Sequence, residues 1–146
     1  MATETGRGTA GPEAEAGLRR ELSSRGAARV RVSGGCMAPA LREGDRVTVF
    51  RGRLPRRGDV ALLSASGWLE IHRLVDRIDL GRRRWYVHLG DASTIPGVAR
   101  PDDILGIVDL PRSERPAPRA HLRGLLLRAG ALLLHLGLPV RRRKEA

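Results

Sequence analysis

The sequence predicts a mainly β domain, an antiparallel sandwich or partly closed barrel, followed by a C-terminal amphipathic helix. Short apolar segments alternate with Gly- and Asp-containing turns at hairpin spacing between residues 29 and 110. No helical pattern separates these segments, which argues against the βαβ units of a parallel sheet. After a Pro-rich stretch, the apolar residues change to the i, i+3, i+4 spacing of an amphipathic helix.

The elements follow from these patterns in chain order. Residues 1–17 are small, polar and Gly-rich, so we expect a disordered tail. Leu18 and Leu22 lie one turn apart, which predicts a short helix over 18–25, and Gly26 ends it. Alternating or continuous apolar runs predict strands at 29–33, 46–50, 60–63, 68–78, 84–89 and 104–110. The β domain thus covers residues 18–112.

Residues 113–118 read as a Pro-rich linker, and residues 119–146 as an amphipathic helix with a basic tail. The helix pattern ends at Pro139, and the cluster Arg141–Lys144 follows. Three interpretations stay open: the helix packs on the β domain, packs on a partner, or lies at an anionic membrane surface with its arginines near the head groups. We favour packing on protein.

The composition restricts the classes of function. The formal charge is +11, and Lys144 is the single lysine. The arginines of the core are scattered, and aromatic residues are few, so we expect no specific nucleic-acid partner. One cysteine excludes an internal disulfide, and the four histidines show no close zinc spacing, so we expect neither a cofactor nor a metal.

The single cysteine and the lengths of the apolar segments predict the cellular compartment of the protein. A free cysteine persists best in a reducing compartment. The N-terminus lacks the apolar region of a signal peptide, and no segment reaches the roughly 20 uninterrupted apolar residues of a spanning helix. We therefore expect a cytoplasmic protein, with peripheral membrane contact through 119–146 as the alternative.

A set of short motifs carries the functional signal. Each is weak alone, because a Gly-Asp pair is usually a turn, but their order and spacing together are informative. In chain order they are Gly34-Gly35-Cys36-Met37-Ala38-Pro39, Gly44-Asp45, Gly58-Asp59, His72-Arg73 and Gly90-Asp91.

This ordered set resembles the signal peptidase I family and its soluble relatives, which share a fold with the self-cleaving repressors. In that family the nucleophilic serine directly precedes Met-x-Pro, Gly-Asp follows, and a Lys or His base lies on a later strand. The resemblance covers about residues 29–110, and it implies that the β domain has a fold of the signal-peptidase type. It implies that Cys36 is the nucleophile and His72 the base, with Asp91 either orienting His72 or shaping its loop.

The same resemblance gives roles to the neighbouring residues. Four of them would line the substrate or support the oxyanion, and three would shape loops. The first group is Gly34, Gly35, Met37 and Pro39, and the second is Gly44, Asp45 and Gly90. Asp45 and Asp59 are expected as turn or cap residues.

The chain also departs from the family. Cysteine replaces the serine, and Gly34 stands where many signal peptidases offer a hydroxyl to the oxyanion. We expect no N-terminal membrane anchor of the kind usual in the family, and Ala92 and Ser93 follow the last Gly-Asp where asparagine is frequent. Backbone N–H groups near Cys36 would then stabilise the oxyanion alone.

The absence of lysine from the core selects the base. Arginine stays protonated in proteins and cannot act as a base, so a working site must use histidine. A neighbouring imidazolium lowers the pKa of a thiol from about 8.5, and we expect a ready thiolate at Cys36. His72 is the expected partner and His88, on the next strand, the second choice. Attack on a peptide or ester carbonyl would give a thioester that water hydrolyses.

Three functions are therefore carried forward. The first is a signal-peptidase-like endopeptidase with a Cys36/His72 dyad, which takes a peptide or protein substrate bound in extended form. The second is a catalytically inactive module of the same fold that binds a peptide or partner, with Cys36 as a small buried residue. The third is a binder of anionic membrane surfaces through 119–146.

Overall fold

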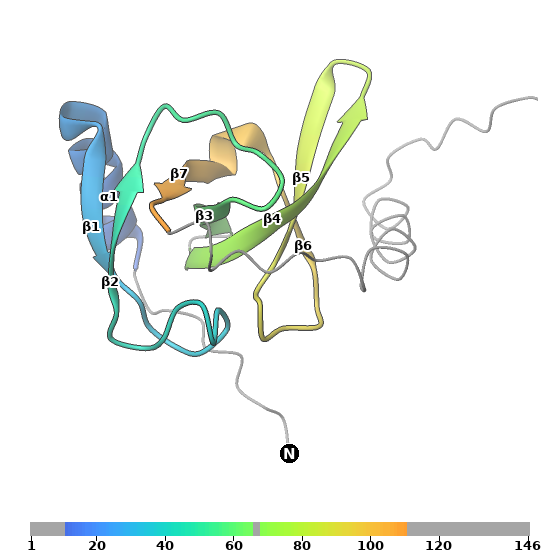
Figure 1. Ribbon diagram of the computed structural model, residues 1–146. Coiled ribbons are helices and arrows are strands. Elements are labelled where there is room, and N and C mark those ends of the chain that lie inside the picture. The colour runs from blue at the N-terminus through green and yellow to red at the C-terminus, as the bar shows by residue number, and fades with distance from the viewer. Residues whose placement is uncertain (1–10, 66–67, 111–146) are drawn as a thin grey trace, which may run out of the picture.

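The computed structural model describes residues 11–65 and 68–110, which form one helix, one 3-10 turn and seven strands (Figure 1). All seven strands pair antiparallel within a single sheet. The mainly β, antiparallel class predicted from the sequence is confirmed. Within the described residues the sheet is open, so the second sheet of a sandwich and the closure of a barrel are not found.

Helix α1 spans Pro12–Arg25, so residues 12–17 are helical rather than part of a disordered tail. Proline at the first turn has a suitable φ and no N–H to lose, and Glu13 and Glu15 lie at the positive end of the helix dipole. Glu15 also pairs with Arg19 one turn later, at 2.7 Å. Gly26, with φ 74°, ends the helix as expected.

The strands agree with the predicted ones to within two residues at most ends, and β2 coincides with its prediction. One strand, β6, was not predicted. Their bounds are β1 Ala27–Arg31, β2 Arg46–Phe50, β3 Val60–Ala65, β4 Trp68–Leu80, β5 Arg83–Leu89, β6 Gly97–Ala99 and β7 Ile104–Val108, with the 3-10 turn η1 at Pro101–Asp103.

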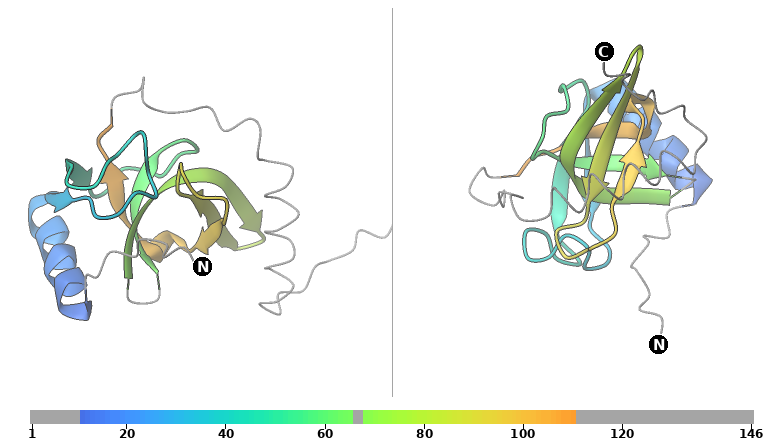
Figure 2. Two further views of the ribbon diagram at one scale, coloured as in Figure 1. Left: turned by 90° about the horizontal axis from the view of Figure 1, so that it is seen from below. Right: turned by 90° about the vertical axis from the view of Figure 1, so that its right-hand side faces the viewer.

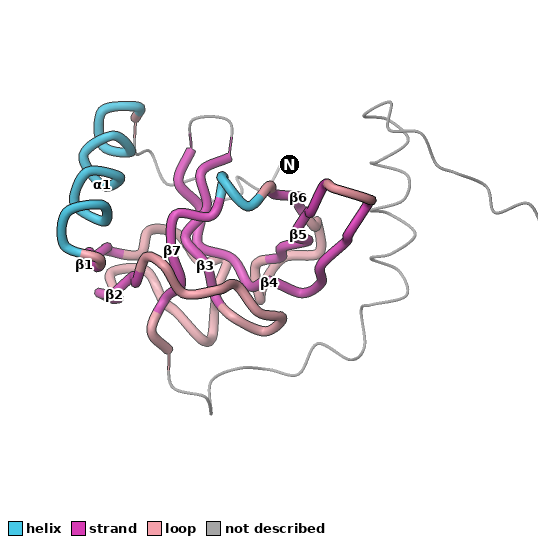
Figure 3. Tube along the Cα trace, turned by 90° about the horizontal axis from the view of Figure 1, so that it is seen from above, coloured by secondary structure: helices cyan, strands magenta, loops and turns pink. Residues whose placement is uncertain are grey.

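The strand order across the sheet is β1-β2-β7-β3-β4-β5-β6. The last strand of the described residues, β7, lies between β2 and β3, and thereby joins the N-terminal hairpin to the β3–β6 meander. The β4–β5 hairpin extends away from α1 (Figure 2). Figure 3 shows α1 beside β1 at one end of the molecule and β5 and β6 at the other.

Both faces of the sheet carry apolar residues, as alternation along the strands requires. Val60 and Leu62 of β3 belong to one core cluster, which also contains Leu22 of α1. Ala61 and Leu63 belong to a second cluster on the opposite face. The two faces matter for the site, because they separate neighbouring residues of β4.

On β4, Leu69 and Ile71 pack against the first cluster, and Leu74 belongs to the second. A register shift between Leu74 and Asp76 marks a bulge in the pairing of β4 with β5. Residues 68–72 of β4 pair with β3 on one side, whereas pairing with β5 on the other side begins at Arg73.

The predicted linker 113–118 and the predicted helix and tail 119–146 lie outside the described residues. In residues 11–65 and 68–110, no helix has the length and apolarity needed to cross a bilayer.

Candidate functional site

Cys36 lies in the turn segment between β1 and β2, half-buried. Its thiol donates a weak hydrogen bond to the carbonyl of Ile71, with Sγ and O 3.8 Å apart. Its own carbonyl accepts a hydrogen bond from the N–H of Ala92 at 2.9 Å. Cys36 therefore bridges the start of β4 and the loop that follows β5, two segments far apart in the sequence.

Gly90 allows this close approach. A Cβ atom at position 90 would lie 2.6 Å from the carbonyl oxygen of Cys36 and 3.1 Å from its Cβ. The first distance is shorter than van der Waals packing permits and the second is tight, so a larger residue would push the loop away from Cys36. The sequence predicted Gly90 as a loop-shaping residue, and the structure gives this role a physical cause.

The residues around Cys36 differ in their surroundings. Met37 is 1% exposed and belongs to the core cluster against which Cys36 packs, which agrees with its expected place beside the site. Gly34 has φ 79°, a conformation that favours glycine. Gly35 and Pro39 are exposed. The oxyanion-supporting roles of these four residues stay predictions.

The expected turn residues are found as turn residues. Gly44 has φ 91°, and the carboxylate of Asp45 accepts a hydrogen bond from the N–H of Arg42 at 2.8 Å. Asp59, also predicted as a turn or cap residue, accepts one from the N–H of Arg56 at 2.9 Å. These bonds fix the two loops that precede β2 and β3.

His72 lies on β4 and meets His88 of β5. Their Nδ1 atoms are 2.9 Å apart, and the rings stack with centroids 5.1 Å apart and planes 30° apart. One Nδ1 must carry a proton and the other must accept it, because two N–H groups cannot face each other at this distance. Glu70, two residues before His72 on the same strand face, brings a carboxylate oxygen to 3.6 Å from the same Nδ1.

The Cys36 thiol lies at the edge of β4, at the Ile71 carbonyl, whereas the His72 side chain lies on one face of the strand. Ile71 packs against the cluster that Cys36 joins, and strand alternation directs His72 to the opposite face. Among the described residues, the thiol bonds to the Ile71 carbonyl and the His72 ring to His88. The expected dyad is therefore not joined by a hydrogen bond in this structure, although the thiol lies beside the residue that precedes His72.

Electrostatics at the site favour neutral groups. Burial raises the pKa of the Cys36 thiol, and the carboxylates of Glu70 and Asp91 raise it further. Burial lowers the pKa of His72, against the opposing effect of the same two carboxylates. Both shifts favour a neutral thiol and a neutral imidazole, in contrast to the thiolate expected from an adjacent imidazolium.

His88 is 4% exposed, and burial together with the neighbouring His72 lowers its pKa to about 4. A glycine on the neighbouring strand makes room for its ring. Gly97 of β6 pairs with His88, and a Cβ at position 97 would lie 2.3 Å from Cε1 of the imidazole. The position of the His88 ring therefore depends on the absence of a side chain at Gly97.

Asp91 accepts two hydrogen bonds from one guanidinium. Nε and Nη2 of Arg73 lie 2.7 and 2.6 Å from the two carboxylate oxygens, and Nη1 donates to the carbonyl of Gly58 at 2.9 Å. The side chains of Arg73 and Asp91 are 2% and 7% exposed. This bidentate pair ties the loop after β5 to β4, which is the loop-shaping alternative for Asp91 rather than the orientation of His72.

The structure brings together a group that the sequence reasoning missed. Donor atoms of Glu70, His72 and His88 all lie within 4.8 Å of one another. The sequence analysis expects no metal, because the four histidines show no close zinc spacing. Close sequence spacing is typical of ligands that share a short loop or a helix, whereas here strands β4 and β5 bring together residues that are distant in the sequence.

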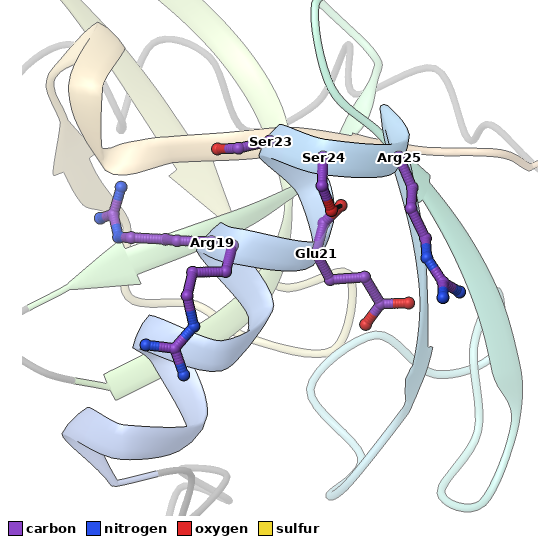
Figure 4. A pocket seen from close by; sticks show the side chains of 6 residues that line it. Arg19, Glu21, Ser23, Ser24 and Arg25 are labelled. Atoms are coloured by element: carbon purple, nitrogen blue, oxygen red, sulfur yellow. Dashed lines mark hydrogen bonds between the residues drawn. The ribbon is translucent and has the colours of Figure 1, made fainter.

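A pocket lies along α1, and Figure 4 shows the side chains around it. One helix supplies every residue that lines it, so no opposing wall of described residues encloses a ligand there. The lining residues are Arg19, Arg20, Glu21, Ser23, Ser24 and Arg25, and none of the predicted site residues is among them.

Comparisons of this chain with protein-family models, with curated proteins and with solved structures found no match. The resemblance to signal peptidases therefore stays a prediction from the motifs, and the function is argued from the chemistry of the site.

Proposed function

We propose that the protein is a signal-peptidase-like endopeptidase that uses Cys36 as its nucleophile and His72 as its base. One observation carries this proposal: the thiol lies 3.8 Å from the Ile71 carbonyl, beside the residue that precedes His72, at an edge of β4. Residues 68–72 pair with β3 on the other side, and β5 begins its pairing at Arg73. An extended peptide could add to this edge and present a carbonyl to the sulfur.

Because the Cys36 thiol and the His72 imidazole are both neutral in the proposed resting state, the mechanism begins with a proton transfer between them. The His72 imidazole takes the thiol proton as Cys36 attacks the peptide carbonyl, and then gives this proton to the leaving amine. A thioester remains on Cys36. His72 next takes a proton from water as water attacks the thioester, and the thiol recovers its proton when it leaves. The sequence of steps requires the His72 ring to turn from His88 toward the sheet edge.

Two contacts support this role for Cys36. The hydrogen bond from Ala92 and the close packing of Gly90 fix the main chain of the nucleophile. The buried pair of Arg73 and Asp91 fixes the loop that carries both residues. Contacts of this kind hold a nucleophile in the position that catalysis requires.

A second candidate function is a peptide-binding module of the same fold without catalysis. The raised pKa of the Cys36 thiol and the bond between His72 and His88 favour it, because both hold the pair in an unreactive state. The edge of β4 would then bind a leader or partner peptide without cleaving it.

Digestion of a peptide library that contains small residues before the cleaved bond separates the two functions. Mass spectrometry identifies the products, and fluorescence anisotropy measures binding of the same peptides. If the protein is an endopeptidase, Cys36→Ala abolishes cleavage and leaves binding intact. If wild type binds the peptides without cleaving them, the module is the correct function, and absence of both activities refutes both candidates.

A further inference from the structure

We propose that Glu70, His72 and His88 form a three-ligand site for Zn²⁺ or a similar divalent transition metal. The proposal does not rest on peptidase activity, because it concerns the face of β4 opposite Cys36. Two imidazole nitrogens and one carboxylate oxygen are a ligand set that zinc accepts.

The distances suit a metal ion. Zinc–nitrogen bonds are about 2.0–2.1 Å long, so two ligand atoms on a tetrahedral ion lie about 3.3 Å apart. The two Nδ1 atoms are 2.9 Å apart, and Glu70 lies 3.6 Å from the Nδ1 of His72. These values bracket the required separation, and all three donor atoms lie within 4.8 Å of one another. Small rotations of the side chains would complete the coordination.

The backbone already holds the ligands in place. Glu70 and His72 alternate onto one face of β4, which pairs with β3 through both positions. His88 comes from β5, and the space above Gly97 fixes where its ring can lie. A metal would therefore meet a formed site rather than order a loose one.

The site also has an entry path. The side chains of His72 and Glu70 are 16% and 21% exposed, whereas His88 is buried. Three protein ligands leave a fourth position for water or a substrate group, the arrangement of open zinc sites. A metal on Nδ1 of His72 would use the lone pair that faces His88, so metal binding would hold this ring away from Cys36.

Isothermal titration of the full-length, untagged protein with Zn²⁺ tests the site. We expect one ion per chain, and at least a tenfold loss of affinity in each of His72→Gln and His88→Gln, since even the loss of a residue that merely supports a metal ligand costs about 10–100-fold. The matched control is the double variant His121→Gln/His135→Gln, which removes the other two histidines of the chain. It should bind Zn²⁺ as wild type does, and so should Cys36→Ala.

A second measurement covers variants that fail to fold. In wild type, Zn²⁺ should shift the imidazole nitrogen resonances of His72 and His88 in NMR spectra and leave those of His121 and His135 in place. The proposal is refuted if wild type binds no Zn²⁺, if neither His72→Gln nor His88→Gln weakens binding, or if the control variant loses it.

Discussion

Replacing Asp91 with asparagine should strongly destabilise the fold, because it removes a carboxylate that binds a buried guanidinium through both oxygens. Arg73 is 1% exposed, and both oxygens of Asp91 bind its guanidinium. Removing one partner of such a buried pair costs about 3–5 kcal/mol. With a urea dependence of about 1.5 kcal/mol per M for a small domain, the unfolding midpoint should fall by about 2–3 M.

Equilibrium urea unfolding, followed by the fluorescence of Trp68 and Trp85, measures this effect. The matched control is Asp79→Asn, because Asp79 also contacts two arginines but is exposed, and exposed ion pairs contribute little. In the double variant Arg73→Met/Asp91→Leu, the loss should be smaller than the sum of the two single losses. An Asp91→Asn midpoint within error of wild type would refute the role of this ion pair in stability.

Three further results are expected. With EDTA present, the free energy of unfolding should fall by about 2 kcal/mol between pH 7.5 and pH 5.0, because the pKa of His88 is about 4 in the folded protein and about 6.5 in the unfolded chain. Urea unfolding at the two pH values measures this fall, which should be smaller in His88→Gln. Gly90→Ala should cost about 1–3 kcal/mol in the same assay through its clash with the Cys36 carbonyl, and an unchanged midpoint would contradict this packing. Alkylation of Cys36 by iodoacetamide should become fast only at a higher pH than for an ordinary exposed thiol, since burial raises its pKa, and fast alkylation near pH 6 would show a thiolate instead.

Local patterns predicted most of the strands, but not how they assemble. Alternation and turn residues located β2 at 46–50 and placed β5 within one residue. The order of the strands depends on β7, whose residues pair with β2 and β3 across forty or more intervening residues. No local signal reports such pairing. The sequence analysis does not predict strand β6, because three residues are too few to show a period, or the start of α1, because its first turn carries no large apolar residue.

The sequence predicted individual residues of the site more readily than the contacts between them. The motif around Cys36 located a residue that the structure holds firmly from two segments. The meeting of His72 with His88 follows from the register of β4 and β5, which includes a bulge that the sequence does not reveal. The partner of Asp91 is likewise a consequence of this register, and sequence reasoning considered His72 rather than Arg73.

Intact-mass spectrometry during turnover of an activated peptide ester tests the central claim, that Cys36 is a nucleophile, most directly. The expected result is a transient acyl adduct on Cys36, absent in Cys36→Ala and longer-lived in His72→Ala, where no base activates water for hydrolysis of the thioester. Ester cleavage that persists in Cys36→Ala, or its complete absence from wild type at every pH, would contradict the claim.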